Sequence, residues 1–173
     1  VEYFARAIDD HLVEPVPLVH EAVAAFRAEA QNFPSPRVSL CKGTNGLGEE
    51  VWRDGRIVAM SDWELARLGD PAYDIAQCQE LLWDDTEALA YYRDVSGIDV
   101  TMEHVDFYRR FYSIVMFSFT NHATHCMIMQ KDRNARLAWV GTEMSHVAAL
   151  RMSFSAGFAP VRESRDSIRP GGR

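Results

Sequence analysis

The chain has 173 residues, of which 47% are hydrophobic and 25% charged, with a formal net charge of -7 at pH 7. This length suits one domain with a sizeable core, which needs neither a disulfide nor a structural metal. The acidic charge argues against non-specific binding to nucleic acid, because its phosphates would be repelled. No apolar run approaches the ~18 residues that a membrane-spanning helix requires.

Cysteine usage indicates a reducing compartment. Cys41, Cys78 and Cys126 are widely spaced and form no CxxC pair. An odd number of cysteines without a disulfide framework favours free thiols, so we expect a cytoplasmic protein. The chain begins with Val1 rather than Met, from which we expect a fragment of a longer protein.

Apolar spacing predicts helices in the N-terminal part of the chain. Residues 3–12 form a short amphipathic stretch. Residues 18–32 are expected to form a longer helix, because apolar side chains recur on one face at spacings of four, three and four: Val19, Val23, Phe26 and Ala30. Prolines at positions 34 and 36 end this helix.

The period then changes, and residues 38–62 are predicted to form a small β-hairpin. Residues 38–41 are a short apolar strand, followed by a glycine-rich loop. Asp54-Gly55 is a turn signal between a strand at 51–52 and a returning strand at 56–61. Asp62 is therefore expected at a strand end, where the chain leaves the sheet.

From Pro71 onward the pattern is helical. Pro71 suits a first helical position, with Asp70 as its N-cap. Residues 161–173 contain four arginines and are predicted to be a disordered basic tail that follows a single domain at 1–160. The predicted fold class is mainly α with a small β-hairpin, and further helices are expected at residues 72–83, 86–95, 102–130 and 134–154.

The segment from Leu40 to Ala76 carries a recognisable motif. An apolar strand is followed by Asp-Trp-Glu at 62–64, Gly-Asp-Pro at 69–71 and Asp-Ile-Ala at 74–76. This order resembles the aminoglycoside-phosphotransferase and choline-kinase-like family. The resemblance implies the helical C-terminal lobe of the protein-kinase-like fold. The N-terminal β-lobe is expected to be absent, because only about forty residues precede the hairpin and they are predicted to be helical.

The resemblance assigns roles within this motif. Asp62 would be the ligand that holds Mg²⁺ against the phosphates of ATP, and an Asp at a strand end can present its carboxylate to a cleft. Trp63 and Glu64 complete the motif. Asp70 and Asp74 suit structural roles, at the N-cap and in the first turn of the following helix.

Upstream, the chain departs from the family. Where the family has His-Gly-Asp, four residues and Asn, alignment on the preceding strand places Lys42-Gly43-Thr44 and Glu49. Thr44 stands at the position of the catalytic base and cannot accept a proton near neutral pH. Glu49 is still a competent Mg²⁺ ligand, Lys42 could meet a phosphate, and Glu50 is the base if the register is shifted by one. The alternative for these three charged residues is a solvated loop.

Two functions stay open from the sequence. The resemblance implies a phosphotransferase that uses ATP and Mg²⁺ on a small-molecule alcohol, for instance an aminoglycoside-like acceptor, in a groove that includes Asn121 and His122. The alternative is a catalytically inactive kinase-like domain that acts as a binding or scaffolding module, because Thr44 replaces the base and the β-lobe is missing. A separate N-lobe or a partner chain would complete the cleft.

Overall fold

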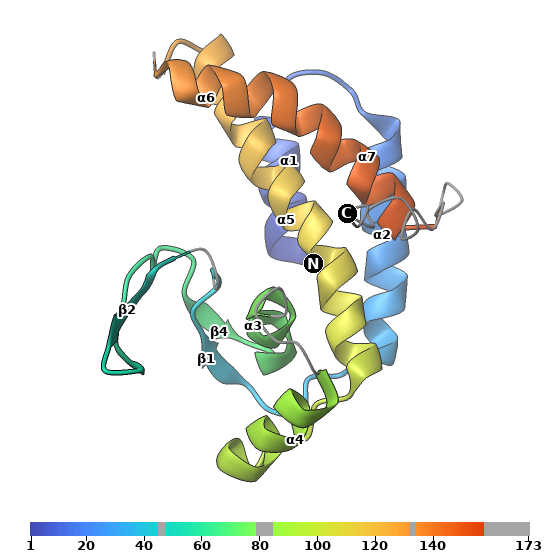
Figure 1. The fold of residues 1–173 in the computed structure, drawn as a ribbon. Helices are drawn as coiled ribbons and strands as arrows, with labels where there is room; N and C mark the ends of the chain where they lie inside the picture. Colours follow the sequence, from blue (N-terminus) through green and yellow to red (C-terminus); the bar gives the residue numbers. More distant parts are fainter. Residues whose placement is uncertain (45–47, 79–84, 132–133, 158–173) are drawn as a thin grey trace, which may run out of the picture.

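A computed structural model describes residues 1–44, 48–78, 85–131 and 134–157, and these form a mostly helical protein with two small antiparallel sheets (Figure 1). The helices are α1 (Glu2–His11), α2 (Pro17–Glu29), α3 (Pro71–Cys78), α4 (Asp85–Ser96), α5 (Met102–Ile128), α6 (Ala135–Trp139) and α7 (Ser145–Ser155). The strands are β1 (Ser39–Cys41), β2 (Glu50–Arg53), β3 (Arg56–Met60) and β4 (Arg67–Gly69). No helix in the described part of the chain is long and apolar enough to cross a membrane.

Helix α5 is the centre of the fold, with α7 and α2 on one side and α3 with the sheets on the other (Figure 1). Its side chains join those of α1, α2 and α7 in the main hydrophobic core. The rings of Phe26, Phe107 and Phe111 lie with their centroids 6.1 Å apart in each pair. Such aromatic contacts add to the free energy gained by burying apolar surface.

A second, smaller core holds α3 and α4 in place. It contains Ala72 of α3, Ile98 and Val100 of the connection after α4, and Val105 of α5. Leu89 and Tyr92 of α4, with other partly buried side chains, pack against it. This cluster positions α3, whose first two turns carry the Asp-Ile-Ala part of the motif.

The predicted hairpin is present as β2 and β3. Asp54 and Gly55 have φ values of 50° and 72°, the left-handed conformations that a tight two-residue hairpin turn requires. Its side chains are largely exposed, including Val51, Trp52 and Val58. The hairpin therefore projects from the helical body instead of covering it (Figure 1).

The first strand of the expected hairpin pairs differently. β1 runs antiparallel to β4, with Ser39 opposite Gly69, and makes no ladder with β2 or β3. β4 lies within the motif loop and was not expected from the sequence. Three residues are too few to show an alternating pattern, and the two strands are far apart in the chain, so no local signal predicts this pairing.

The helix bounds differ in detail from the expected ones. The first long helix ends at Glu29 and continues as a 3-10 turn to Asn32. The C-terminal helix is interrupted at Val140–Met144 by a π-helical turn, where Thr124 Oγ1 of α5 donates to Gly141 O at 2.7 Å. Residues 79–83 of the helix expected at 72–83, and the tail expected to be disordered at 161–173, lie outside the described residues.

Candidate functional site

Asp74 of α3 anchors the loop that follows β1. The backbone N–H groups of Lys42 and Gly43 donate to Asp74 Oδ2 and Oδ1 at 2.6 and 3.0 Å. The hydroxyl of Tyr73 donates to Gly43 O at 3.3 Å. Asp74 was expected only to favour the helix dipole, so its role as the anchor of this loop was missed. The sequence marks Asp74 only as part of the Asp-Ile-Ala motif, because its partner Lys42 lies about thirty residues earlier in the chain.

Glycine is required at position 43. Gly43 has φ of +92°, and a Cβ atom there would lie 2.5 Å from Leu65 O. The loop therefore packs directly against the chain that follows Asp62. This close approach joins the two halves of the motif, which are separate in the sequence.

Lys42 and Thr44 stabilise the loop from within. Lys42 is only 4% exposed, and its Nζ donates to Thr44 O and, at 3.2 Å, to Thr44 Oγ1. Thr44 Oγ1 in turn donates to Asp62 O at 2.8 Å. The amine of Lys42 thus turns into the loop, and the hydroxyl of Thr44 links the loop to the end of the hairpin.

Asp62 follows β3 in a left-handed conformation, with φ of 62°. Left-handed non-glycine residues store backbone strain and are frequent at functional sites. Its neighbour in the motif, Trp63, donates from Nε1 to Met60 O at 2.8 Å and so closes the turn. The Asp62 side chain lies at the strand end, as the sequence pattern predicted.

Two carboxyl groups meet at this turn. A hydrogen bond between the side chains of Glu64 and Asp62 raises the pKa of Glu64, and the charge of Asp62 raises it further. Two neighbouring carboxylates resist simultaneous ionisation, so the pair is a natural place for a proton or a cation.

Glu49 and Glu50 lie at the base of the hairpin. The backbone N–H of Ser61 donates to Glu49 O at 2.9 Å, which brings Glu49 beside the residue before Asp62. The charge of Glu50 raises the pKa of Cys78 at the end of α3, after burial and the charge of Asp74. Among the described residues, no group of three or more His, Cys, Asp or Glu side chains is arranged to hold a metal ion.

Asp70 forms a buried pair that the sequence did not predict. Its Oδ1 accepts from Ala72 N at 2.9 Å, the geometry of a helix N-cap. Its Oδ2 lies 2.9 Å from His104 Nε2, with the two side chains 4% and 8% exposed. The His104 ring is stacked against Phe33 and Tyr108. Burial raises the pKa of Tyr108, and the charge of Asp70 adds to that effect. This pair ties α3 to α5 beneath the motif.

The two expected groove residues, Asn121 and His122, do not share one surface. Asn121 is buried, and its Nδ2 donates to Ile8 O at 3.4 Å, which ties α5 to α1. The His122 ring packs edge-on to His11 at 4.3 Å and lines a cavity of about 210 Å³ beside Leu65. Partial burial lowers the pKa of His122, and the nearby histidines lower it further. Only His122 lies on the side of the motif loop.

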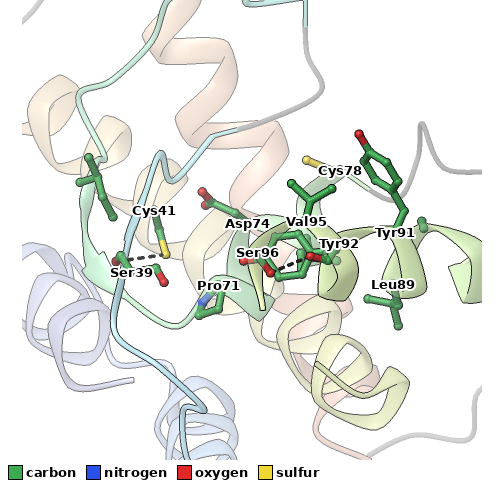
Figure 2. Close-up of a pocket in the computed structure, with 13 residues that line it drawn as sticks. Ser39, Cys41, Pro71, Asp74, Cys78, Leu89, Tyr91, Tyr92, Val95 and Ser96 are labelled. Atoms are coloured by element: carbon green, nitrogen blue, oxygen red, sulfur yellow. Dashed lines mark hydrogen bonds between the residues drawn. The ribbon is translucent and has the colours of Figure 1, made fainter. Parts of the chain in front are cut away.

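A larger cavity, of about 550 Å³, opens between β1, α3 and α4 (Figure 2). Asp74 lines this cavity while its carboxylate holds the loop. The cavity therefore lies next to the anchor of the motif, on the side formed by α3 and α4.

The fold of the chain is similar to that of a protein of known structure. No protein-family model matches the chain, and no curated protein matches it. The crystal structure of a protein from Ralstonia eutropha JMP134, described as a "putative aminoglycoside phosphotransferase", superposes on 92% of this chain with a TM-score of 0.70 and 16% identity. The chain shares the fold of that protein. It spans 54% of the length of that protein, and at this identity the similarity is one of fold.

Proposed function

We propose that the chain is the helical C-terminal lobe of a small-molecule phosphotransferase, in which Asp62 binds Mg·ATP and the acceptor is an alcohol. The observation that carries this proposal is the contact between the Asp62 and Glu64 carboxyl groups at the hairpin end, in a chain with a kinase-like fold. A divalent cation would relieve the repulsion between these carboxylates when both are ionised.

The residues fit such a cation. Carboxylate oxygens are hard ligands, and Mg²⁺ is usually held by one or two of them together with waters and substrate phosphates, so a cage of three protein ligands is not needed. Asp62 would bind the ion, with Glu64 or Glu49 as the second carboxylate. When bound, the ion would neutralise charge on the transferring phosphoryl group.

The remaining residues would position the reactants. Asp74 and Gly43 hold the loop against the hairpin end, which keeps the Lys42–Thr44 segment next to Asp62. Phosphoryl transfer depends chiefly on positioning and electrostatic stabilisation, so slow turnover needs no base. Thr44 donates its hydroxyl to a carbonyl and cannot take the proton of the acceptor. We therefore expect weak activity.

A second lobe would complete the nucleotide cleft. The chain spans 54% of the length of the protein from Ralstonia eutropha JMP134. The exposed apolar side chains of Val51, Trp52 and Val58 suit coverage by another domain. We expect this lobe to come from additional sequence or from a partner chain. The acceptor would be an alcohol of the aminoglycoside-like kind, used in the cytoplasm.

Titration of the full-length protein with ATP in the presence and absence of Mg²⁺ tests the proposal. Asp62→Asn should weaken Mg²⁺-dependent binding at least about tenfold, because it removes the principal ligand. Asp54→Asn is the matched control: it removes the same charge at the hairpin turn and should bind as the unmodified protein does. Equal affinity with and without Mg²⁺, or equal affinity of the two variants, would contradict the proposal.

A second function, that of a kinase-like binding module without catalysis, is favoured by one observation. The group at the position of the base is a hydroxyl already donated to Asp62 O. Measurement of acceptor-dependent ATP turnover by the unmodified protein and by Thr44→Asp separates the two functions. Turnover by the unmodified protein rules out the module. Turnover that appears only in Thr44→Asp, with a gain of about a hundredfold or more, supports it.

A further inference from the structure

The cavity between β1, α3 and α4 has the features of a small-molecule site. Its volume of about 550 Å³ lies within the range of ligand pockets, roughly 300–1,000 Å³. Figure 2 shows Pro71, Leu89, Tyr92 and Val95 around it, and Ile75 of α3 is part of the same wall. Most of the lining is thus apolar or aromatic.

The charge inside the cavity is negative. Asp74 is the one ionisable carboxylate among its described lining residues, and no Lys, Arg or His is among them. Burial raises the pKa of Cys41 and of Cys78, at opposite parts of the wall, to about 11, and the charge of Asp74 is the next cause in both cases. Asp70 acts in the same direction on Cys41, and Glu50 on Cys78.

Two cationic side chains near the cavity, Lys42 and Arg67, make their contacts outside it. Lys42 donates its amine to Thr44, although its charge lowers the pKa of Cys78 somewhat. The guanidinium of Arg67 lies over the rings of Phe4 and Tyr73, at 4.7 and 4.5 Å from their centroids. Neither side chain lines the cavity, so neither neutralises Asp74 from within it.

We propose that this cavity binds a small organic cation with an apolar body, such as an arylalkyl amine, with its ammonium group at Asp74. Each oxygen of Asp74 accepts one backbone N–H and keeps lone-pair capacity for a further donor. The apolar body would lie among Leu89, Tyr92 and Ile75, where burial of its surface and contact with the tyrosine ring favour binding.

Occupancy of the cavity would be sensed by the loop. The carboxylate that meets the ammonium group is the one that holds the N–H groups of Lys42 and Gly43. A ligand at Asp74 therefore perturbs these two amides directly. The proposal does not rest on phosphoryl transfer, because it involves neither Asp62 nor a nucleotide.

The test is a titration of the 173-residue chain with 2-phenylethylamine and with its neutral counterpart 2-phenylethanol, followed by calorimetry and by the amide NMR signals of Lys42 and Gly43. We expect the amine to bind at least tenfold more tightly than the alcohol at pH 7 and to shift both amide signals. Ala88→Trp, which fills the cavity from α4, should abolish binding of both compounds. Ala24→Trp, on the exposed face of α2, is the matched control and should leave binding unchanged.

The variant Asp74→Asn then tests whether the negative charge of Asp74 is needed to bind the amine. If this variant folds, it should bind the amine and the alcohol with equal affinity; if it does not, the Ala88→Trp comparison still decides the site. Equal affinities in the unmodified chain, no binding of the amine, or unchanged binding by Ala88→Trp would each overturn the proposal.

Discussion

Replacement of Asp74 by Ala should destabilise the protein substantially. The change removes both acceptors from the N–H groups of Lys42 and Gly43, which belong to buried residues. A hydrogen bond to a charged group contributes roughly 1.5–3 kcal/mol, and an unsatisfied buried donor costs about 1–3 kcal/mol. Because Asp74 itself is only half-buried, water can replace part of what is lost. We therefore expect a loss of about 2–4 kcal/mol, a large share of the ~5–15 kcal/mol typical of a domain.

Urea unfolding followed by tryptophan fluorescence and circular dichroism measures this loss. Amide hydrogen exchange locates it, since the N–H groups of Lys42 and Gly43 should lose protection before the core of α5 does. Asp10→Ala, at an exposed position of α1, removes the same charge and should change stability by less than about 0.5 kcal/mol. A loss below about 1 kcal/mol in Asp74→Ala, with both amides still protected, would refute the anchoring role.

Three further outcomes follow from the same geometry. Gly43→Ala should lower the free energy of unfolding in urea by more than about 2 kcal/mol, because φ at this position is positive and the new Cβ would meet a backbone oxygen. Gly48 has φ of +87° in open space, so Gly48→Ala should lower the free energy of unfolding only by the backbone strain, about 1–2 kcal/mol. Asp62→Asn should lower the pKa of Glu64 toward its ordinary value in a carboxyl ¹³C titration. Because folding raises the pKa of Glu64, this carboxyl group stabilises the folded chain at pH values below its ordinary pKa. That stabilisation is lost as the pH rises through the pKa of Glu64 in the folded chain. The Cys41 thiol, with its pKa raised to about 11, should react with iodoacetamide at pH 8 at least about a hundredfold more slowly than an unstructured peptide thiol.

The helices and the β2–β3 hairpin could be predicted from the sequence because their signals are local. Apolar periodicity locates α2, and the Asp54-Gly55 turn fixes the hairpin. The pairing of β1 with β4 and the π-helical turn at Gly141 could not be predicted in this way. Both depend on contacts between segments far apart in the chain, which no short window of sequence contains.

The candidate site was predictable in its residues and less so in their contacts. The motif identified Asp62, Glu64 and Asp74, and the structure brings all three to the loop or the hairpin end. That Asp74 binds backbone N–H groups, and that Asp70 meets His104, depends on how α3 lies against the loop and α5. Side-chain partners of this kind are set by tertiary packing, so residue type and spacing alone leave them open.

The altered residues of the loop are consistent with one another. Thr44 can donate to the carbonyl of Asp62, which a carboxylate at that position could not do when ionised. The buried amine of Lys42 requires acceptors, and Thr44 supplies both of those identified, its carbonyl and its hydroxyl. An aspartate at position 44 would exchange the link to Asp62 for electrostatic repulsion between the two carboxylates, partly offset by attraction to Lys42. The loop is therefore stabilised as a linker between Asp74 and the hairpin end, and any gain of catalysis in Thr44→Asp should be accompanied by a loss of stability.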